Sequence, residues 1–160
     1  MPNPGQLTIS PGATGDAVRV LQRALRRSPM WGFVVDGVFG PKTEAAVKDI
    51  QQSAGLTVDG VVGPQTWAAL PNGAPMPRLQ EGSTGQVVER LQQVLTGGAW
   101  NTSPGAIDGF FGPSTKASVQ AFQTWGGVTA DGIVGDQTWG VQLGAAGATL
   151  ESEVGLQYAT

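Results

Sequence analysis

Hydrophobic residues recur at helical spacing in six short stretches of the chain. In the first, residues 16–27, Val18, Leu21 and Leu25 share one face while most charged residues lie elsewhere, as in an amphipathic helix. Thr14, whose side chain offers an oxygen, is the predicted N-cap of this helix. The six predicted helices are residues 16–27, 41–53, 64–70, 86–95, 113–125 and 136–143. The pattern therefore predicts an all-α fold.

The six helices fall into two sets because the chain repeats itself. Residues 12–22 return as residues 82–92, and residues 36–70 match residues 108–142 at 18 of 35 positions. A repeat of this length predicts two tandem three-helix bundles, residues 10–71 and 80–143. They are joined by a short, stiff, proline-rich linker, residues 72–79, and we expect the acidic tail, residues 144–160, to be disordered or weakly packed.

A shorter motif, Asp-Gly-x-x-Gly-x-x-Thr, occurs four times. We expect its Asp to accept turn N–H groups, its first Gly to have a positive φ, its two middle apolar residues to enter the core, and its last four residues to begin a helix. A calcium loop is not expected, because the positions that must supply oxygen ligands would be Val38, Gly40 and Val47. The copies begin at Asp36, Asp59, Asp108 and Asp131.

Composition excludes several kinds of chemistry. The 160 residues include no histidine and no cysteine, so Ser-His-Asp and Cys-His catalysis, histidine-ligated zinc and disulfides are not expected. We expect no metal and no cofactor. No stretch approaches the roughly 20 apolar residues of a membrane span, and the start lacks the pattern of a signal peptide. We therefore expect no membrane contact.

Charge argues against a nucleic-acid partner. The formal net charge is -3, and the main basic feature is a stripe of Arg19, Arg23 and Arg27 in the first predicted helix. The second repeat has Glu89, Gln93 and Gly97 at these positions, so the stripe is not a shared feature. We interpret it as a solvated helix face.

Taken together, the residues resemble the peptidoglycan-binding domain family. Both repeats carry Gly-x-x-Val-x-x-Leu-Gln, then Asp-Gly-x-Phe-Gly-x-x-Thr-x-x-Ala/Ser-Val-x-x-Ile/Phe-Gln, then Asp-Gly-x-Val-Gly-x-x-Thr-Trp. Two departures are small: Asp136 replaces the proline of the other copies, and the loop 97–107 is two residues longer than its counterpart. The family is a three-helix module often attached to bacterial and phage wall hydrolases.

The resemblance implies non-catalytic binding of bacterial peptidoglycan, through its stem peptide or its glycan, in a groove between helices. It also implies a place at the cell wall, outside the cell or on a virion, and a separate enzyme that supplies any catalysis. Independently of the resemblance, two copies of a small module favour a bivalent binder of a polymer, because the second contact gains effective concentration from a short linker.

The residue types suggest which side chains contact the ligand. Trp67 and Trp139 occupy equivalent positions that face inward, so we expect them in the cores. The other tryptophans lie in loops or at a helix end, where an indole can stack on a sugar. The turn aspartates could meet amide or amino groups, or could simply stabilise their turns. The candidate ligand-binding residues are Trp31, Asp36, Asp59, Trp100, Asp108, Trp125 and Asp131.

Two other functions remain open at this point. One is a protein-interaction adaptor within a phage particle or a secretion machine, which the lack of a visible signal peptide keeps in play. The other is a wall hydrolase that uses two carboxylates. The hydrolase is disfavoured because no segment outside the two repeats has the length of a catalytic domain.

Overall fold

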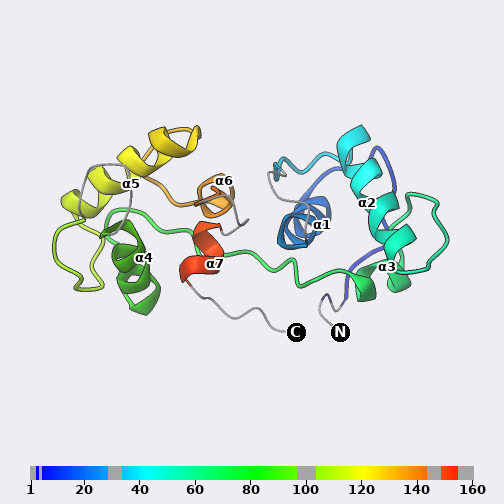
Figure 1. The fold of residues 1–160 in the computed structure, drawn as a ribbon, viewed down its shortest axis with the longest axis horizontal. Helices are drawn as coiled ribbons and strands as arrows, with labels where there is room; N and C mark the ends of the chain where they lie inside the picture. The colour runs from blue at the N-terminus through cyan, green and yellow to red at the C-terminus, as the bar shows by residue number, and fades with distance from the viewer. Residues whose placement is uncertain (1–2, 4, 29–33, 97–103, 144–148, 155–160) are drawn as a thin grey trace. The chain divides into compact units, whose positions relative to one another are not determined.

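The computed structural model describes residues 3, 5–28, 34–96, 104–143 and 149–154. These residues form seven helices, and their only extended pairings are isolated bridges (Figure 1). The described residues up to Pro75 make one compact unit, and those from Met76 onward make a second. The predicted all-α fold with two modules is confirmed.

The first unit contains α1 (Asp16–Arg27), α2 (Pro41–Ser53) and α3 (Pro64–Ala69). Its core joins all three helices, because Leu21 and Leu25 of α1, Val47 of α2 and Trp67 of α3 belong to one buried cluster. Both α2 and α3 begin with a proline, whose fixed φ suits the first helical position and whose missing N–H is not needed there.

The start of α1 differs from the prediction. The residue before the helix is Gly15, with φ +111° and no side-chain capping bond, so the prediction of Thr14 as N-cap is wrong. Thr14 instead pairs with Val38 in an isolated antiparallel bridge, which holds the entrance of α1 against the following turn. The second unit repeats this bridge between Thr84 and Phe110.

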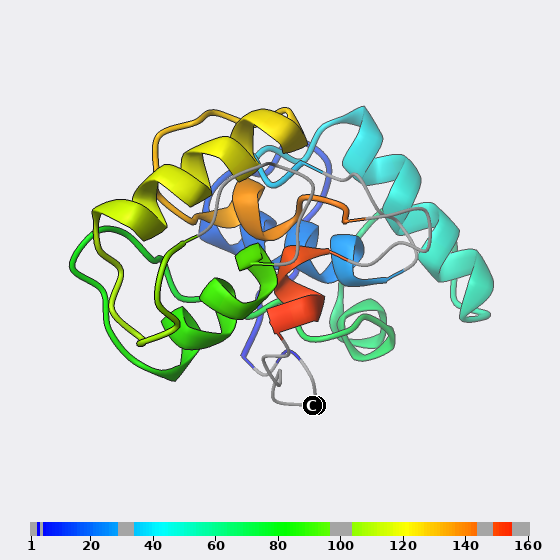
Figure 2. The ribbon, with the colours of Figure 1, turned by 60° about the vertical axis from the view of Figure 1, so that its left-hand side comes forward.

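The second unit contains α4 (Gln86–Thr96), α5 (Pro113–Gly126), α6 (Asp136–Trp139) and α7 (Leu150–Val154). Helix α6 ends at Trp139 rather than continuing to residue 143, and Gln142 forms a bridge with Thr149. Helix α7, which the sequence pattern did not predict, packs against α4 and α6 (Figure 2). Its two apolar residues, four positions apart, are both buried, so residues 149–154 are a packed part of the unit.

The two inward-facing tryptophans are confirmed as core residues. Trp67 and Trp139 are 2% and 0% exposed. Each indole N–H still has a partner, because Trp67 Nε1 donates to the carbonyl of Leu7 at 3.0 Å and Trp139 Nε1 donates to that of Pro77 at 2.9 Å. The residues before each module therefore anchor its third helix.

The interpretation of the arginine stripe as a solvated face is wrong for Arg23 and Arg27, whereas the side chain of Arg19 is 43% exposed. Arg23 and Arg26 are buried. The Nε group of Arg23 donates to the carbonyl of Gly73 at 2.8 Å, and Arg27 donates to that of Asn72 at 2.8 Å. The carbonyls of residues 72 and 73 replace water around the guanidinium groups, so the segment expected to be linker begins as part of the first unit.

Candidate functional site

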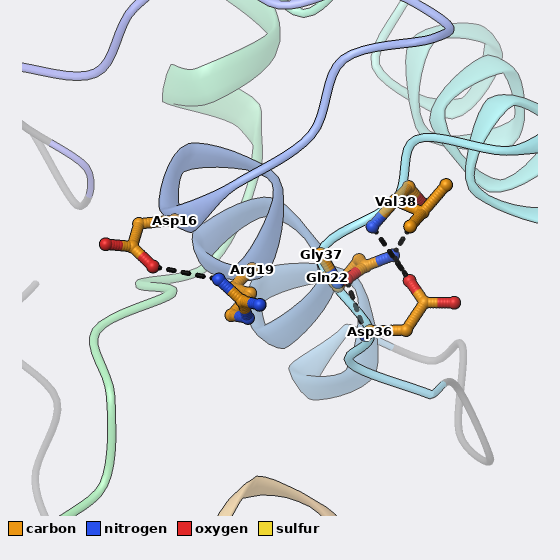
Figure 3. A network of polar contacts seen from close by, with 6 residues as sticks. All are labelled: Asp16, Arg19, Gln22, Asp36, Gly37 and Val38. Carbon is orange, nitrogen blue, oxygen red and sulfur yellow. Dashed lines mark hydrogen bonds and ion pairs between the residues drawn. The ribbon is translucent and has the colours of Figure 1, made fainter.

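A buried glutamine organises each Asp-Gly turn. Gln22 of α1 is 1% exposed, and its Nε2 donates to Asp36 Oδ1 at 2.8 Å and to the carbonyl of Val38 at 3.0 Å (Figure 3). The same amide group contacts the hydroxyl of Thr43 at 3.3 Å. In return, Gln22 Oε1 accepts the backbone N–H groups of Asp36 and Gly37. One side chain thus joins α1, the turn and the first turn of α2.

The same arrangement, called here the glutamine clamp, occurs four times. In every copy the amide nitrogen bonds the turn aspartate, the carbonyl two residues later and the threonine that follows. These glutamines are not among the predicted site residues, although a glutamine recurs before each Asp-Gly motif. The clamps comprise Gln22 with Asp36, Gln51 with Asp59, Gln92 with Asp108, and Gln123 with Asp131.

The mechanical interpretation of the motif is partly confirmed. Each aspartate Oδ1 accepts the N–H of the residue two positions later, and Gly37 has φ +75°. A Cβ on Gly37 would lie 3.0 Å from the guanidinium carbon of Arg19, the far end of a flexible side chain, so the positive φ is what favours glycine there. The expectation that both middle apolar residues of the motif enter the core is wrong for one of the two. Phe39 is buried but Val38 is 49% exposed, because successive side chains of an extended segment point to opposite sides.

The four turn aspartates are fixed anions. In each, the pKa is lowered, chiefly by the N–H of the residue two positions later. The clamping glutamine amide is the next cause for three of them, whereas for Asp131 partial burial, which acts in the opposite direction, comes before it. A general acid needs a raised pKa, so these carboxylates are not placed to donate protons at neutral pH.

A shallow hollow of about 500 Å³ opens in the first unit beside the start of α3. Asp59 is the candidate residue that lines it. The apolar walls come from Leu56, Val61 and Pro64, and none of the lining residues is aromatic. The full lining is Gln51, Leu56, Thr57, Asp59, Val61, Gly63, Pro64, Gln65 and Thr66.

The candidate residues do not converge on one site. The four aspartates belong to four separate clamps, and the described segments contain no group of three acidic side chains that could hold a metal ion. Trp125 lies in the last turn of α5, 43% exposed, with its ring centroid 5.9 Å from that of buried Phe122. Trp31 and Trp100 lie outside the described residues.

The helices set one further boundary on function. Within the described part of the chain, none combines the length and the apolar content that a membrane crossing requires.

Comparison with known proteins identifies the modules. The family model described as a putative peptidoglycan binding domain matches residues 14–70 and 84–141. The zinc D-Ala-D-Ala carboxypeptidase of Streptomyces albus G is 49% identical over 61 residues, which are 38% of this chain and 24% of that protein.

Two further relatives match both modules. N-acetylmuramoyl-L-alanine amidase CwlL of Bacillus licheniformis is 34% identical over 132 residues, 78% of this chain and 33% of the amidase. The autolytic lysozyme of Clostridium acetobutylicum is 37% identical over 136 residues, 84% of this chain and 40% of the lysozyme. The chain therefore spans well under half the length of these relatives. With both repeats matched, the chain belongs to the peptidoglycan-binding domain family and carries two copies of the domain in tandem.

Proposed function

We propose that this chain binds bacterial peptidoglycan through its two modules and does not itself cleave it. The observation that carries the proposal is the family match of both units, each of which has a complete core and two intact glutamine clamps. The fixed, ionised state of the turn aspartates supports the non-catalytic part.

The small share of each relative that this chain covers also supports binding without catalysis. Those relatives bear the names of enzymes, and this chain corresponds to 24%, 33% and 40% of their lengths. We assign hydrolysis of peptidoglycan to segments that this chain does not share with them. Its own task is to hold a catalytic partner, or itself, at the cell wall.

Two modules on one chain gain from bivalency. Once one module is bound to the polymer, the other samples neighbouring ligands at an effective concentration on the order of millimolar. Two weak contacts at shallow surfaces then give a high overall affinity for the polymer. Among the candidate side chains, exposed Trp125 is a proposed additional wall contact in the second unit.

Co-sedimentation with purified, protein-free sacculi tests the proposal. We expect the chain to pellet with the sacculi while the turbidity of the suspension stays constant. Protein that remains in the supernatant with sacculi of several bacterial types would contradict wall binding. Clearing of the suspension, abolished by substitution of a single carboxylate, would contradict the non-catalytic assignment.

A further inference from the structure

The sequence contains five dipeptides that are chemically fragile. Where glycine follows aspartate or asparagine, no side chain shields the glycine nitrogen from the carboxyl or carboxamide carbon before it, so the pair readily rearranges through a five-membered succinimide ring. The fold demands the glycines, because the four in the turns have φ between +74° and +76° and a Cβ on the fifth would lie 2.0 Å from a backbone oxygen. The pairs are Asp36-Gly37, Asp59-Gly60, Asn72-Gly73, Asp108-Gly109 and Asp131-Gly132.

The rearrangement closes a ring and opens it again. The glycine nitrogen gives up its proton and attacks the side-chain carbonyl carbon. A C–N bond forms, and a protonated carboxyl leaves as water or a carboxamide leaves as ammonia, which carries the proton away. Water then opens the ring at either carbonyl and yields aspartate or isoaspartate, whose backbone is one carbon longer. The first step therefore needs a glycine N–H that can lose its proton and a side chain that can turn toward it.

In the four turns the clamping glutamine holds that N–H. Its Oε1 accepts the N–H of Gly37 at 2.8 Å, that of Gly60 at 3.0 Å, and those of Gly109 and Gly132 at 2.9 Å. All four glycines are buried, although the aspartate before each is exposed. An anionic nitrogen would face the lone pairs of the glutamine oxygen, and burial keeps water from stabilising the charge, so loss of the proton is disfavoured.

The fifth pair has the same protection from an unrelated part of the chain. The N–H of Gly73 donates to Oδ1 of Asn3 at 2.9 Å, and Asn3 is 5% exposed. Thus each of the five glycine N–H groups meets the amide oxygen of a buried side chain, in the clamps and outside them. This shared contact is the observation from which the inference is drawn.

The side chain before each glycine is also held. Oδ1 of every turn aspartate accepts the N–H of the residue two positions later, and Asn72 Oδ1 accepts that of Ala74 at 2.7 Å. These bonds restrict the rotation that would bring the carbonyl carbon onto the glycine nitrogen. In the aspartates the same N–H groups lower the pKa, so the protonated carboxyl that could leave as water is rare at neutral pH.

We propose that the buried side-chain amides protect the five pairs from succinimide formation, and that each pair becomes a modification site when its amide is removed. The glutamine clamp then has a chemical task beside its mechanical one, since it preserves a turn that needs the fragile Asp-Gly sequence. The inference goes beyond wall binding and does not depend on it.

Asn72 should be the most sensitive of the five sites. Its carboxamide leaves as ammonia without the protonation that an ionised aspartate requires. Its own carbonyl binds Arg27 and the next one binds Arg23, so a longer backbone at this point would displace both contacts with α1. Deamidation of Asn72 would therefore loosen the end of the first unit.

Peptide mapping of the full chain tests the proposal, with electron-transfer fragmentation to distinguish isoaspartate from aspartate. The chain is incubated at neutral pH in buffer and in urea. In urea we expect all five pairs to react, Asn72 first, and in buffer we expect each rate to be at least about tenfold lower. Rates in buffer that equal those in urea would overturn the proposal.

Asn3→Ala separates the amide from the fold. It removes the acceptor of the Gly73 N–H and leaves all four clamps in place. We expect Asn72 to deamidate at least about tenfold faster in buffer, while the clamped aspartates stay unreactive. Leu7→Ala is the matched control, because the side chain of Leu7 is exposed in the same N-terminal segment. An unchanged rate at Asn72 in Asn3→Ala would overturn the proposal.

A clamp variant carries its own control. Gln51→Met keeps the length of the side chain and removes the amide, so Asp59 should form isoaspartate at least about tenfold faster than Asp36, which Gln22 still clamps. Both pairs share any unfolding of the first unit, and sucrose in the buffer favours its folded state. Equal rates at the two aspartates in the folded variant would overturn the proposal, and a variant that does not fold leaves the decision to Asn3→Ala.

Discussion

The two units build the same clamped bundle and close it in different ways. In the first, Arg23 and Arg27 on α1 bond the carbonyls of residues 73 and 72. In the second, the sequence has Gln93 and Gly97 at the equivalent positions, and the extra helix α7 packs against α4. The repeats share the clamps and the core. They differ in the cover, by which we mean the segment that lies on the first helix of each unit: residues 72 and 73, held by polar contacts, in the first unit, and the apolar side of α7 in the second.

The polar cover of the first unit extends to the chain start. The side chain of Asn3 donates to the carbonyls of Trp67 and Pro71, and it accepts the backbone N–H of Gly73. Gly73 itself has no room for a side chain, because a Cβ would lie 2.0 Å from the carbonyl oxygen of Val20. Segments at both ends of the module are therefore joined to α1 and α3 by hydrogen bonds.

The largest effect should come from the part that the units share. Replacing Gln51 by Leu removes five hydrogen bonds and leaves buried turn N–H groups without a partner, which should cost about 4 kcal/mol. Gln123→Leu should cost a similar amount in the second unit. Urea unfolding, followed by the indole N–H signals of Trp67 and Trp139, measures each unit separately.

Gln52→Leu is the control for the clamp variants, because Gln52 is the exposed neighbour of Gln51. It should leave the free energy of unfolding within about 0.5 kcal/mol of the wild-type value. If the clamp variants were no less stable than this control, the clamps would not be the common stabilising element.

A smaller loss is expected from the apolar cover of the second unit. Leu150 is fully buried, and Leu150→Ala should destabilise that unit by about 3 kcal/mol because apolar contact is lost and a cavity remains. The unfolding of the first unit should not change. Glu153→Ala, at an exposed position of α7, serves as the control. Equal destabilisation of both units would contradict this division.

The polar cover of the first unit should contribute somewhat less. Arg23→Ala removes a bond from a guanidinium group to a carbonyl and should cost about 2 kcal/mol, again by urea unfolding. The matched control is Gln93→Ala, the exposed counterpart in α4. A loss no larger than that of the control would show that residues 72 and 73 are a linker after all.

These contrasts show which features were accessible from the sequence. The bounds of α1 and α2 follow from hydrophobic spacing and from the Gly-Pro start, both of which are local signals. The burial of Arg23 depends on Gly73, fifty residues away, and no local pattern indicates it. Helix α7 has five residues and only two apolar ones, too few to show a period.

The candidate site was predictable to a similar degree. The four turn aspartates were found because they recur, and the structure adds that their partners are glutamines on the preceding helix. Thr57 and Gln65 were not singled out, since an exposed Thr or Gln carries no distinctive signal by itself. Only the structure shows that both line the hollow beside Asp59.

The smallest expected effect concerns pH. The folded pKa of the turn aspartates lies below the ordinary value of 3.8, so their contribution to stability is complete above that pH and is lost as the pH falls through the lower folded value. The urea midpoint should stay level from pH 7 to pH 5 and decrease below about pH 4. Asp59→Asn should reduce the decrease. A midpoint that rises on acidification would contradict the assignment.

The most direct test of the account is the binding isotherm of the full wild-type chain on purified, protein-free sacculi. Bivalent wall binding predicts that the chain binds saturably and stays bound when the sacculi are dilute, because a released module rebinds at a high effective concentration. Protein that stays in the supernatant at every concentration of sacculi would contradict it.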